Sequence, residues 1–425
     1  MEHSGLIERG VTSHLRSLLL EEPVLVLNGP RTVGKSTLLQ ELAQCAGRVI
    51  LDLDEDATLR AVALDPALYA AGPSPVLVDE FQKLPGLLDA IKAELNRAVR
   101  PGRFVLTGST RYAALPRVAQ SLTGRVHVVE IWPLTQLELD GAAGNFCQVL
   151  LEDPRSLVSA VPAATSRAEY ERRVLRGGLP LATLRSGQAS RARWFGDYVR
   201  LVIERDVLEI KEIRQRDVLP RILRAVAAQT GSVFQARRLA NQLDLDQRLV
   251  ADYVALLESV FLVQMLPAWG RTLGSRVAVA PKAHMVDSGL AAHLLLLNES
   301  RLASRDPAIM TEFGHVVESF AVQEIVRQGG WLTEPVSFGH YRTHDQTEVD
   351  LVVESYDGRV AAVEVKASAK VSEGDFRGMR SLRERIGSRF VGGVLLNLGT
   401  MSYTAEDRIH VLPLDRLWHP VSAQP

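Results

Sequence analysis

The stretch that decides the fold of this chain is PVLVLNGPRTVGKSTLLQEL, residues 23–42. It begins as an apolar run of strand length, continues through a glycine-bearing loop and ends in a run of helix-forming residues. Gly29, Gly34, Lys35 and Ser36 fit the pattern GxxxxGK[ST]. In such a loop the backbone N–H groups converge on phosphate oxygens, and the N-terminus of the following helix adds partial positive charge. The stretch therefore predicts a strand, loop and helix that bind a phosphate-bearing nucleotide.

Individual residues of this loop have separate expected roles. Lys35 should reach the β- and γ-phosphates of ATP, and the Ser36 hydroxyl should hold Mg²⁺. The alternative, a glycine-rich turn in front of an ordinary core helix, fits the surrounding strand and helix poorly. We therefore expect ATP and Mg²⁺ as cofactors. The predicted nucleotide-binding residues are Gly29, Pro30, Arg31, Thr32, Val33, Gly34, Lys35, Ser36 and Thr37.

Four further runs have the composition of strands. They are RVILDLD at 48–54, PVLVDEF at 75–81, RFVLTGST at 103–110 and RVHVVEIW at 125–132. Helical stretches separate them, which predicts an α/β fold: one parallel sheet of five strands with helices on both faces.

Polar residues follow two of these strands. Asp79 and Glu80 lie at the carboxyl end of a strand, where ligands of open α/β sheets bind. We expect Asp79 to orient the Mg²⁺ shell and Glu80 to polarise the attacking water. Acidic residues at this position can also be simple helix caps, but the phosphate loop upstream favours catalysis. Thr107 and Ser109 are candidates for contacting the γ-phosphate, and Ser109 is preferred.

An arginine is usually needed to neutralise charge at the γ-phosphate, often from a neighbouring subunit. The nearest candidates are Arg125 and Arg111, with Arg125 preferred. An arginine that is solvated or ion-paired is the ordinary alternative, because the chain contains 42 arginines and only seven lysines.

The middle of the chain is basic and helical. Residues 152–166, EDPRSLVSAVPAATS, have the composition of a linker. Residues 167–224 hold 14 basic and 8 acidic residues, a local charge of +6. This is either a surface for a phosphate backbone or, as we prefer for most of these residues, a set of ion-paired helix faces.

Residues 216–283 have the pattern of a winged helix: two short helices followed by a hairpin. The second helix carries Asp252 and Glu258 around a single Arg248, so we expect it to pack on protein and not to enter a DNA groove. Arg237 and Arg238, on the helix before it, could still contact phosphates.

A second candidate site lies near the end of the chain. TEVDLVVESYDGRVAAVEVKAS, residues 347–368, predicts a hairpin whose three-residue loop ends in a left-handed Gly358. Residues whose numbers sum to 714 then lie opposite each other, so Asp350 faces Glu364, and Lys366 lies on the same side. Two carboxylates at this distance predict a Mg²⁺ or Mn²⁺ site beside a catalytic lysine. A solvated strand face of paired charges is the alternative.

The pattern Asp-x13-Glu-x-Lys resembles the PD-(D/E)xK nuclease core, in which a preceding helix commonly supplies another acid. Glu318 is the matching position, so the predicted metal ligands here are Glu318, Asp350 and Glu364. Together with NGPRTVGKST, VLVDEFQKLPGLLDAIK, RGGLP and APKAHMVDSGLAAHLL, the chain resembles a bacterial and archaeal family of AAA-type ATPases. In that family a C-terminal domain of unknown function has a nuclease-like core.

The resemblance implies four domains or regions. We expect an ATPase domain at 1–141, a helical basic connection at 142–215, a winged-helix-like domain at 216–290 and a restriction-endonuclease-like α/β domain at 291–425. The expected function is an Mg-dependent ATPase whose nucleotide state controls a nuclease-like domain that interacts with nucleic acid, DNA more than RNA. The alternative is an ATP-driven regulatory switch or interaction module with no nuclease activity. A homo-oligomer that shares an arginine between subunits is a further expectation.

Composition limits the binding partners and the cellular location that this chain is expected to have. The 425 residues carry a formal net charge of −1, so any binding to nucleic acid must come from a local patch. Apolar runs are too short to span a bilayer, and no secretory signal is visible. Cys45 and Cys147 lack the spacing of a disulfide framework or a zinc site. These features predict a cytoplasmic protein that does not bind membranes.

Overall fold

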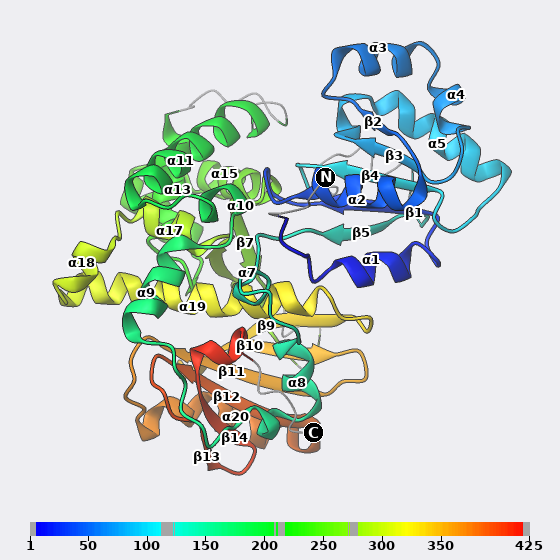
Figure 1. The fold of residues 1–425 in the computed structure, drawn as a ribbon. Helices are drawn as coiled ribbons and strands as arrows, with labels where there is room; N and C mark the ends of the chain where they lie inside the picture. Colours follow the sequence, from blue (N-terminus) through cyan, green and yellow to red (C-terminus); the bar gives the residue numbers. More distant parts are fainter. Residues whose placement is uncertain are drawn as a thin grey trace.

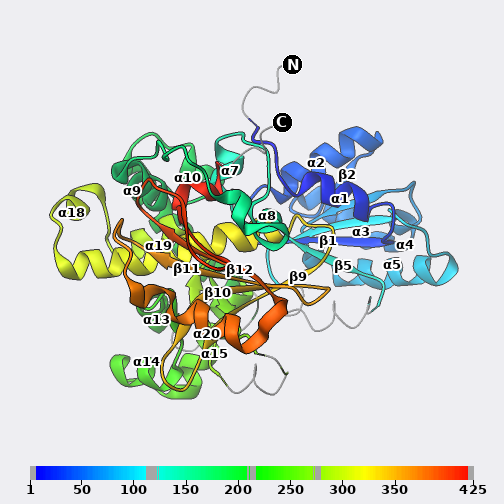
Figure 2. The ribbon, with the colours of Figure 1, turned by 90° about the horizontal axis from the view of Figure 1, so that it is seen from below.

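The computed structural model describes residues 6–419 except 112–121, 123, 208–209, 211–216, 271 and 273–278. Three sheets organise the described chain: one of five strands, one of three strands and one of six strands. Helix α19 (Pro307–Gly329) runs across the middle of the molecule between the regions built on these sheets (Figures 1 and 2). No helix among the described residues has both the length and the apolar character to cross a bilayer.

The first sheet contains all five strands predicted in the N-terminal third. Its order is β2-β3-β4-β1-β5, and every pair is parallel. Every residue of the central strand β1 is buried, as expected for a sheet covered on both faces. The strands are β1 (Val24–Asn28), β2 (Ile50–Asp52), β3 (Val76–Asp79), β4 (Phe104–Gly108) and β5 (His127–Glu130). The helices around them are α1 (Thr12–Leu18), α2 (Lys35–Ala46), α3 (Asp56–Leu64), α4 (Pro66–Ala70) and α5 (Pro85–Arg97).

The segment predicted as a linker, residues 152–166, is instead packed against the C-terminal sheet. Helix α8 (Phe146–Glu152) and a 3₁₀ turn (Pro154–Leu157) lead into it, and the Ala163 N–H donates to the Thr400 carbonyl at 2.7 Å. At the start of α8 the buried Phe146 donates its N–H to Gln328 Oε1 of α19 at 2.6 Å. The prediction was wrong because proline and serine content was weighed above the apolar residues between them.

In the middle region, strand β6 follows α13 and precedes α14 and α15, and β7 and β8 come after these helices. The three strands form a sheet of order β6-β8-β7, in which both pairs are antiparallel. The tip of the predicted hairpin, at 271 and 273–278, lies outside the described residues, and the winged-helix assignment stays a prediction. The elements are α9 (Arg167–Arg176), α10 (Pro180–Thr183), α11 (Gln188–Leu201), a π-helix (Val202–Val207), α13 (Val218–Ala227), β6 (Ser232–Val233), α14 (Ala236–Leu243), α15 (Gln247–Ser259), β7 (Val263–Leu266) and β8 (Lys282–Met285). Several arginines of the basic stretch are ion-paired, as preferred from the sequence: Arg167 with Glu171, Arg172 with Glu169, Arg173 with Asp140 and Arg200 with Asp197.

The C-terminal region is a mixed sheet of order β13-β14-β12-β11-β10-β9. The predicted hairpin register is confirmed: Leu351 pairs with Val363, numbers that sum to 714, and Gly358 has φ +85°. The expected domain boundary between residues 290 and 291 falls inside α17 (Ser288–Leu294), which packs on α9 and α19. The elements are α17 (Ser288–Leu294), α18 (Glu299–Ala303), β9 (Val336–Arg342), β10 (Glu348–Ser355), β11 (Val360–Lys366), α20 (Arg377–Ile386), β12 (Phe390–Asn397), β13 (Tyr403–Glu406) and β14 (Ile409–Pro413).

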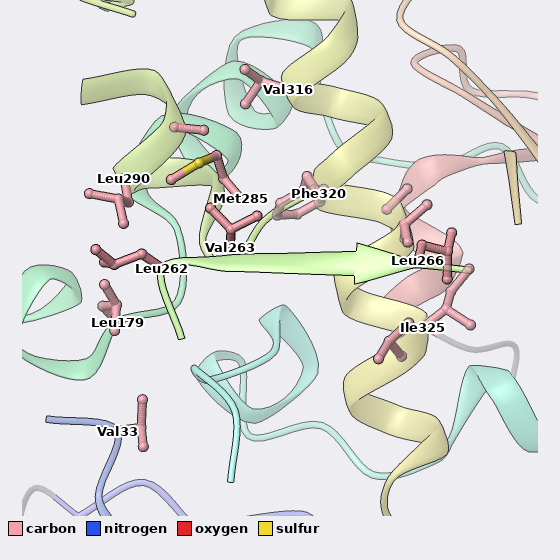
Figure 3. Close-up of a cluster of buried hydrophobic side chains, with 14 of the residues drawn as sticks. Val33, Leu179, Leu262, Val263, Leu266, Met285, Leu290, Val316, Phe320 and Ile325 are labelled. Carbon is pink, nitrogen blue, oxygen red and sulfur yellow. The ribbon is translucent and has the colours of Figure 1, made fainter. Parts of the chain in front are cut away.

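A single apolar cluster joins these regions. It contains Val33 of the phosphate loop, Leu179, Leu262 beside β7, and Phe320 of α19. Figure 3 shows Leu262 beside β7 and Phe320 on α19, with Val33 on the separate segment of the phosphate loop. Because packed cores deform little, we expect a displacement of the loop at Val33 to shift the helices whose side chains belong to the same cluster.

Candidate functional site

The phosphate-binding loop connects β1 to α2, and its two glycines are required for different reasons. A Cβ at position 29 would lie 2.1 Å from the Ile131 carbonyl oxygen, so only glycine lets the loop pass β5. Gly34 has φ +96° and precedes the first residue of α2. The loop therefore has the backbone course that the sequence pattern predicted.

Lys35 is buried and points back into this loop. Its Nζ donates to the carbonyl oxygens of Gly29 at 2.9 Å and Pro30 at 2.7 Å. Burial lowers the pKa of the Lys35 ammonium to about 8, although the carboxylates of Glu80 and Asp79 oppose this. The ammonium thus lies among the carbonyls of the loop and close to both acidic residues.

The acidic residues after β3 form a connected group with the end of β4. Asp79 Oδ1 accepts hydrogen bonds from the Thr107 hydroxyl and, at 3.1 Å, from the Glu80 N–H. Glu80 Oε2 accepts from Gln82 and lies 3.4 Å from the Ser109 hydroxyl. Burial raises the pKa of Glu80, against the nearby Lys35 ammonium. Thr107 thus contacts the first acid and Ser109 the second, and the preference for Ser109 at the γ-phosphate stays a prediction.

A cavity of about 420 Å³ extends from this group to a patch of apolar side chains. The loop and the start of α2 form its polar end, with Ser36 and Glu80 in the wall. Its apolar end includes Leu6, which is 59% exposed, and Leu184, which is 70% exposed. Ile7, Leu134, Pro180 and Leu181 complete that end. A polar end rich in N–H groups beside an apolar hollow suits a nucleotide with its phosphates on the loop and its base among the leucines.

Two arginines hold the loop to other regions of the chain, and sequence reasoning gave neither contact. Arg9 donates to the Val33 carbonyl at 2.7 Å and the Trp132 carbonyl at 2.8 Å, and pairs with Glu138 at 2.9 Å. Arg31, within the loop, donates from Nε to Asp206 of the π-helix at 2.6 Å.

The two arginines proposed for the γ-phosphate lie in different places. Arg125 precedes β5 and donates to Asn96 Oδ1 at 2.6 Å. It therefore lies at the amino ends of the parallel strands, whereas the phosphate loop follows the carboxyl end of β1. This position does not favour a contact with the nucleotide of its own chain, and a contact with a neighbouring subunit stays a prediction. Arg111 pairs with Glu130 at 2.6 Å, donates to the Glu258 carbonyl at 2.9 Å and lies over the Phe261 ring. It joins the end of β4 to the middle region.

The predicted C-terminal residues are brought together, but not as a metal site. Asp350, Glu364 and Lys366 lie on neighbouring strands, and Glu318 approaches from α19. Lys366 donates to Glu364 Oε1 at 2.9 Å, and the Val365 N–H donates to Asp350 Oδ2 at 3.0 Å. No group of three or more histidine, cysteine, aspartate or glutamate residues in the described part of the chain is arranged to hold a metal ion.

A lysine of the middle region occupies the space between these acids. Nζ of Lys282, in β8, lies 2.7 Å from Glu318 Oε1, 2.9 Å from Asp350 Oδ1 and 2.5 Å from Glu348 Oε1. Burial alone would raise the pKa of Asp350, but the Lys282 ammonium holds it below its usual value. The prediction that Glu318, Asp350 and Glu364 bind a divalent cation does not fit this arrangement, because an ammonium already lies between the carboxylates.

The sequence did contain one signal for Lys282. Lysine is rare in this chain, with seven residues in all, so each lysine that occurs in place of arginine is a candidate for a special role. For Gln82, Arg9 and Asp206 the sequence offers no comparable sign, because their partners are set by the tertiary fold.

Three stretches of the chain match known families. Residues 21–139 match an AAA domain, residues 167–301 a domain of unknown function (DUF8612), and residues 313–417 another domain of unknown function (DUF4143). The N-terminal region is therefore an AAA-type domain, in agreement with its sheet order and loop. These matches do not test the nuclease-like assignment of the last domain.

Similar whole chains and structures are also known. An uncharacterized protein of Mycobacterium tuberculosis is 29% identical over 379 residues, 88% of this chain and 77% of that protein, and one of Mycobacterium bovis gives the same values. A Walker-type ATPase of Pyrococcus abyssi shares 16% identity over 69% of this chain and 97% of its own, with a TM-score of 0.38. RuvB of Thermotoga maritima, a Holliday junction branch migration motor, shares 19% over 61% and 90%, with a TM-score of 0.30. Both TM-scores are below 0.5, so neither structural likeness supports an inference about this chain.

Proposed function

Because residues 21–139 match an AAA domain, we propose that this protein is an Mg-dependent ATPase that uses its nucleotide state as a switch on the regions that follow. The observation that carries the proposal is the cavity whose wall contains both the phosphate loop and Glu80. A site for binding alone would not need a half-buried carboxylate beside the lysine of the loop.

The described residues suit Mg-ATP. The Ser36 hydroxyl borders the polar end of the cavity, and Asp79 lies behind it with its carboxylate held by Thr107. A bound Mg²⁺ would neutralise phosphate charge there. Lys35 would exchange its two carbonyl partners for phosphate oxygens. Glu80 would orient a water for attack on the γ-phosphorus and accept its proton, while the bond to the β-phosphate oxygen breaks and ADP leaves.

Two contacts support transmission of the nucleotide state to the middle region. Arg31 of the loop is paired with Asp206, and Arg111, two residues after Ser109, is bound to the end of α15. Both segments border the position expected for the γ-phosphate. Hydrolysis would therefore change the surroundings of two interdomain anchors.

For the C-terminal region we favour the reading without nuclease activity. Helix α19 precedes the hairpin of β10 and β11, which is the arrangement that the sequence pattern predicted around Glu318, Asp350 and Lys366. Its acids, however, surround the Lys282 ammonium. We propose that this domain serves as a partner-binding or nucleic-acid-binding module controlled by the ATPase.

Nucleic-acid binding is the first interaction to test, and the exposed face of α14 favours a part in it for the middle region as well. Arg237, Arg238, Asn241 and Gln242 are exposed and line one shallow hollow together with Gln235. Guanidinium and amide groups side by side suit phosphate and base contacts. We expect Arg237→Glu with Arg238→Glu to weaken DNA binding and to reduce its salt dependence, measured by fluorescence anisotropy at two salt concentrations. Equal binding by the variant would remove α14 from the proposal.

ATP hydrolysis is tested by phosphate release from the pure protein with Mg²⁺. Lys35→Ala should lose nucleotide binding, whereas Glu80→Gln should bind ATP and lose about 10²-fold or more in turnover. Lys92→Ala, on the exposed face of α5, is the matched control and should behave as wild type. Unchanged turnover in Glu80→Gln would refute the assignment of that carboxylate.

Cleavage is tested separately with plasmid and linear DNA in Mg²⁺ or Mn²⁺. We expect no nicking above that of Lys366→Ala. Metal-dependent nicking that Lys366→Ala removes would restore the nuclease reading.

A further inference from the structure

Lys282 belongs to the middle region, but its side chain enters the acidic cluster of the last domain. It belongs to β8, where its backbone pairs with Val233 of β6 and Leu266 of β7. Its side chain is 1% exposed and reaches three carboxylates, one on α19 and two on β10. Arg342 lies 3.6 Å from the other oxygen of Glu348, on the outer side of the cluster.

The position of the ammonium is the one that a coordinated cation would take. Its nitrogen is between 2.5 and 2.9 Å from oxygens of three different residues. A divalent ion such as Ca²⁺ holds carboxylate oxygens at about 2.3–2.6 Å and Mg²⁺ at about 2.0–2.1 Å. The same oxygens could close on either ion only if the lysine were withdrawn, because the ammonium and the ion would occupy the same space.

A fourth carboxylate beside this position lacks a full set of partners. Glu364 is 9% exposed, and its Oε2 is buried without a hydrogen-bond partner among the described residues. Its other oxygen accepts from Lys366. Buried polar atoms normally have partners, so a free carboxylate oxygen next to an internal ammonium indicates a site with unused capacity for a cation.

The charges around the cluster agree with this view. Glu318, Glu348, Asp350 and Glu364 face Lys282 and Lys366, and His284 and His340 lie near Lys282. Burial and the presence of Lys282 lower the pKa of both histidines, to about 3 and about 4, so neither adds positive charge at neutral pH. The four acids therefore share three cations: the two ammonium groups and the Arg342 guanidinium, which lies 3.6 Å from Glu348.

From this geometry we propose that Lys282 is a built-in cation that closes a latent divalent-metal site formed by Glu318, Glu348, Asp350 and Glu364. The lysine does two things at once. It neutralises the carboxylates that a metal would otherwise require, and it fastens β8 of the middle region to α19 and β10 of the last domain. A metal can enter only in a state, or in a variant, from which the ammonium is absent.

The test compares Mn²⁺ binding in wild type, Asp350→Asn, Lys282→Ala and the double variant Lys282→Ala with Asp350→Asn. Free Mn²⁺ is measured by its electron paramagnetic resonance signal, without nucleotide so that the phosphate loop does not recruit the ion. Wild type and Asp350→Asn should bind equally. Lys282→Ala should gain one site at least tenfold tighter than any in wild type, and the double variant should lose it.

Two results would overturn the proposal. One is Mn²⁺ binding by wild type that Asp350→Asn abolishes, since the site would then be open with the lysine present. The other is a folded Lys282→Ala protein, judged by circular dichroism and thermal melting, that gains no site. Should Lys282→Ala fail to fold, the comparison of wild type with Asp350→Asn still decides whether the lysine keeps the site closed.

Discussion

Arg31 of the phosphate-binding loop donates from Nε to the carboxylate of Asp206 at 2.6 Å, across 175 positions of sequence. Asp206 is 2% exposed and lies in a one-turn π-helix (Val202–Val207) that follows α11. π-Helical turns are rare and are often found at functional sites. The pair couples the loop mechanically to the middle region at the place where phosphates are expected to bind.

Asp206→Asn is predicted to raise ATP affinity. The change removes a negative charge near Lys35 and releases the Arg31 guanidinium toward the phosphates, and a coupling of about 1 kcal/mol corresponds to about fivefold in Kd. Isothermal titration calorimetry checks this. Asp197→Asn, which breaks the exposed pair with Arg200 on α11, is the control and should leave Kd unchanged. Unaltered affinity in Asp206→Asn would show that the two sites are not coupled.

ATP binding should weaken above pH 8. Lys35 must be charged to hold phosphates, and burial lowers the pKa of its ammonium to about 8 in the free protein. Below that pH the group is charged and contributes no pH dependence; above it, each pH unit reduces the charged fraction about tenfold. Kd measured at pH 7 and pH 9 should differ by roughly tenfold. The residual binding of Lys35→Ala should lack this dependence, and a flat profile in wild type would contradict the role of Lys35.

Glu364→Gln should stabilise the protein at alkaline pH. Burial, with the neighbouring Asp350, raises the pKa of Glu364 to about 8, above the ordinary value of 4.5. Between pH 4.5 and 8 the folded state therefore keeps a proton that the unfolded chain has lost, and stability falls as the pH rises. Glutamine mimics the protonated form, so the melting temperature of the variant relative to wild type should rise from pH 5 to pH 9. A difference that stays constant, as expected of Glu373→Gln with its exposed carboxylate, would contradict this.

Gly29→Ala should destabilise the first domain even without nucleotide. The new methyl group would lie 2.1 Å from the Ile131 carbonyl oxygen, a backbone atom that cannot move without disturbing β5. Overpacking of this kind costs about 1–3 kcal/mol. Gly86→Ala, near the start of α5 with no atom within 4 Å of the added Cβ, is the matched control and should be neutral or stabilising. Urea denaturation followed by circular dichroism compares the two, and equal midpoints would refute the packing argument.

Local sequence patterns were sufficient to predict most helices and strands, and also the geometry of segments that are short in sequence. The phosphate loop follows from residues 29–36 alone, because its glycines, lysine and hydroxyl act within one turn of chain. The register of the hairpin at 348–366 follows from its loop length, since a three-residue loop ending in Gly358 leaves one way to pair the strands.

The linker prediction at 152–166 failed for the opposite reason. Whether a segment with proline and serine is free or packed depends on the surface beside it in the fold. Here that surface belongs to the C-terminal region, where the Ala163 N–H donates to the Thr400 carbonyl.

The sequence by itself determined the phosphate-loop motif and the hairpin of facing acids, because both depend on residues close together in the chain. Only the tertiary structure decided what surrounds them. It placed Asp206 against Arg31, placed Arg125 at the amino end of β5, away from the end of β1 that carries the loop, and put the Lys282 ammonium where a metal was expected. The physical reason is that the role of a charged side chain depends on the charged groups nearest to it. In a folded chain those neighbours are determined by tertiary packing and not by separation along the sequence.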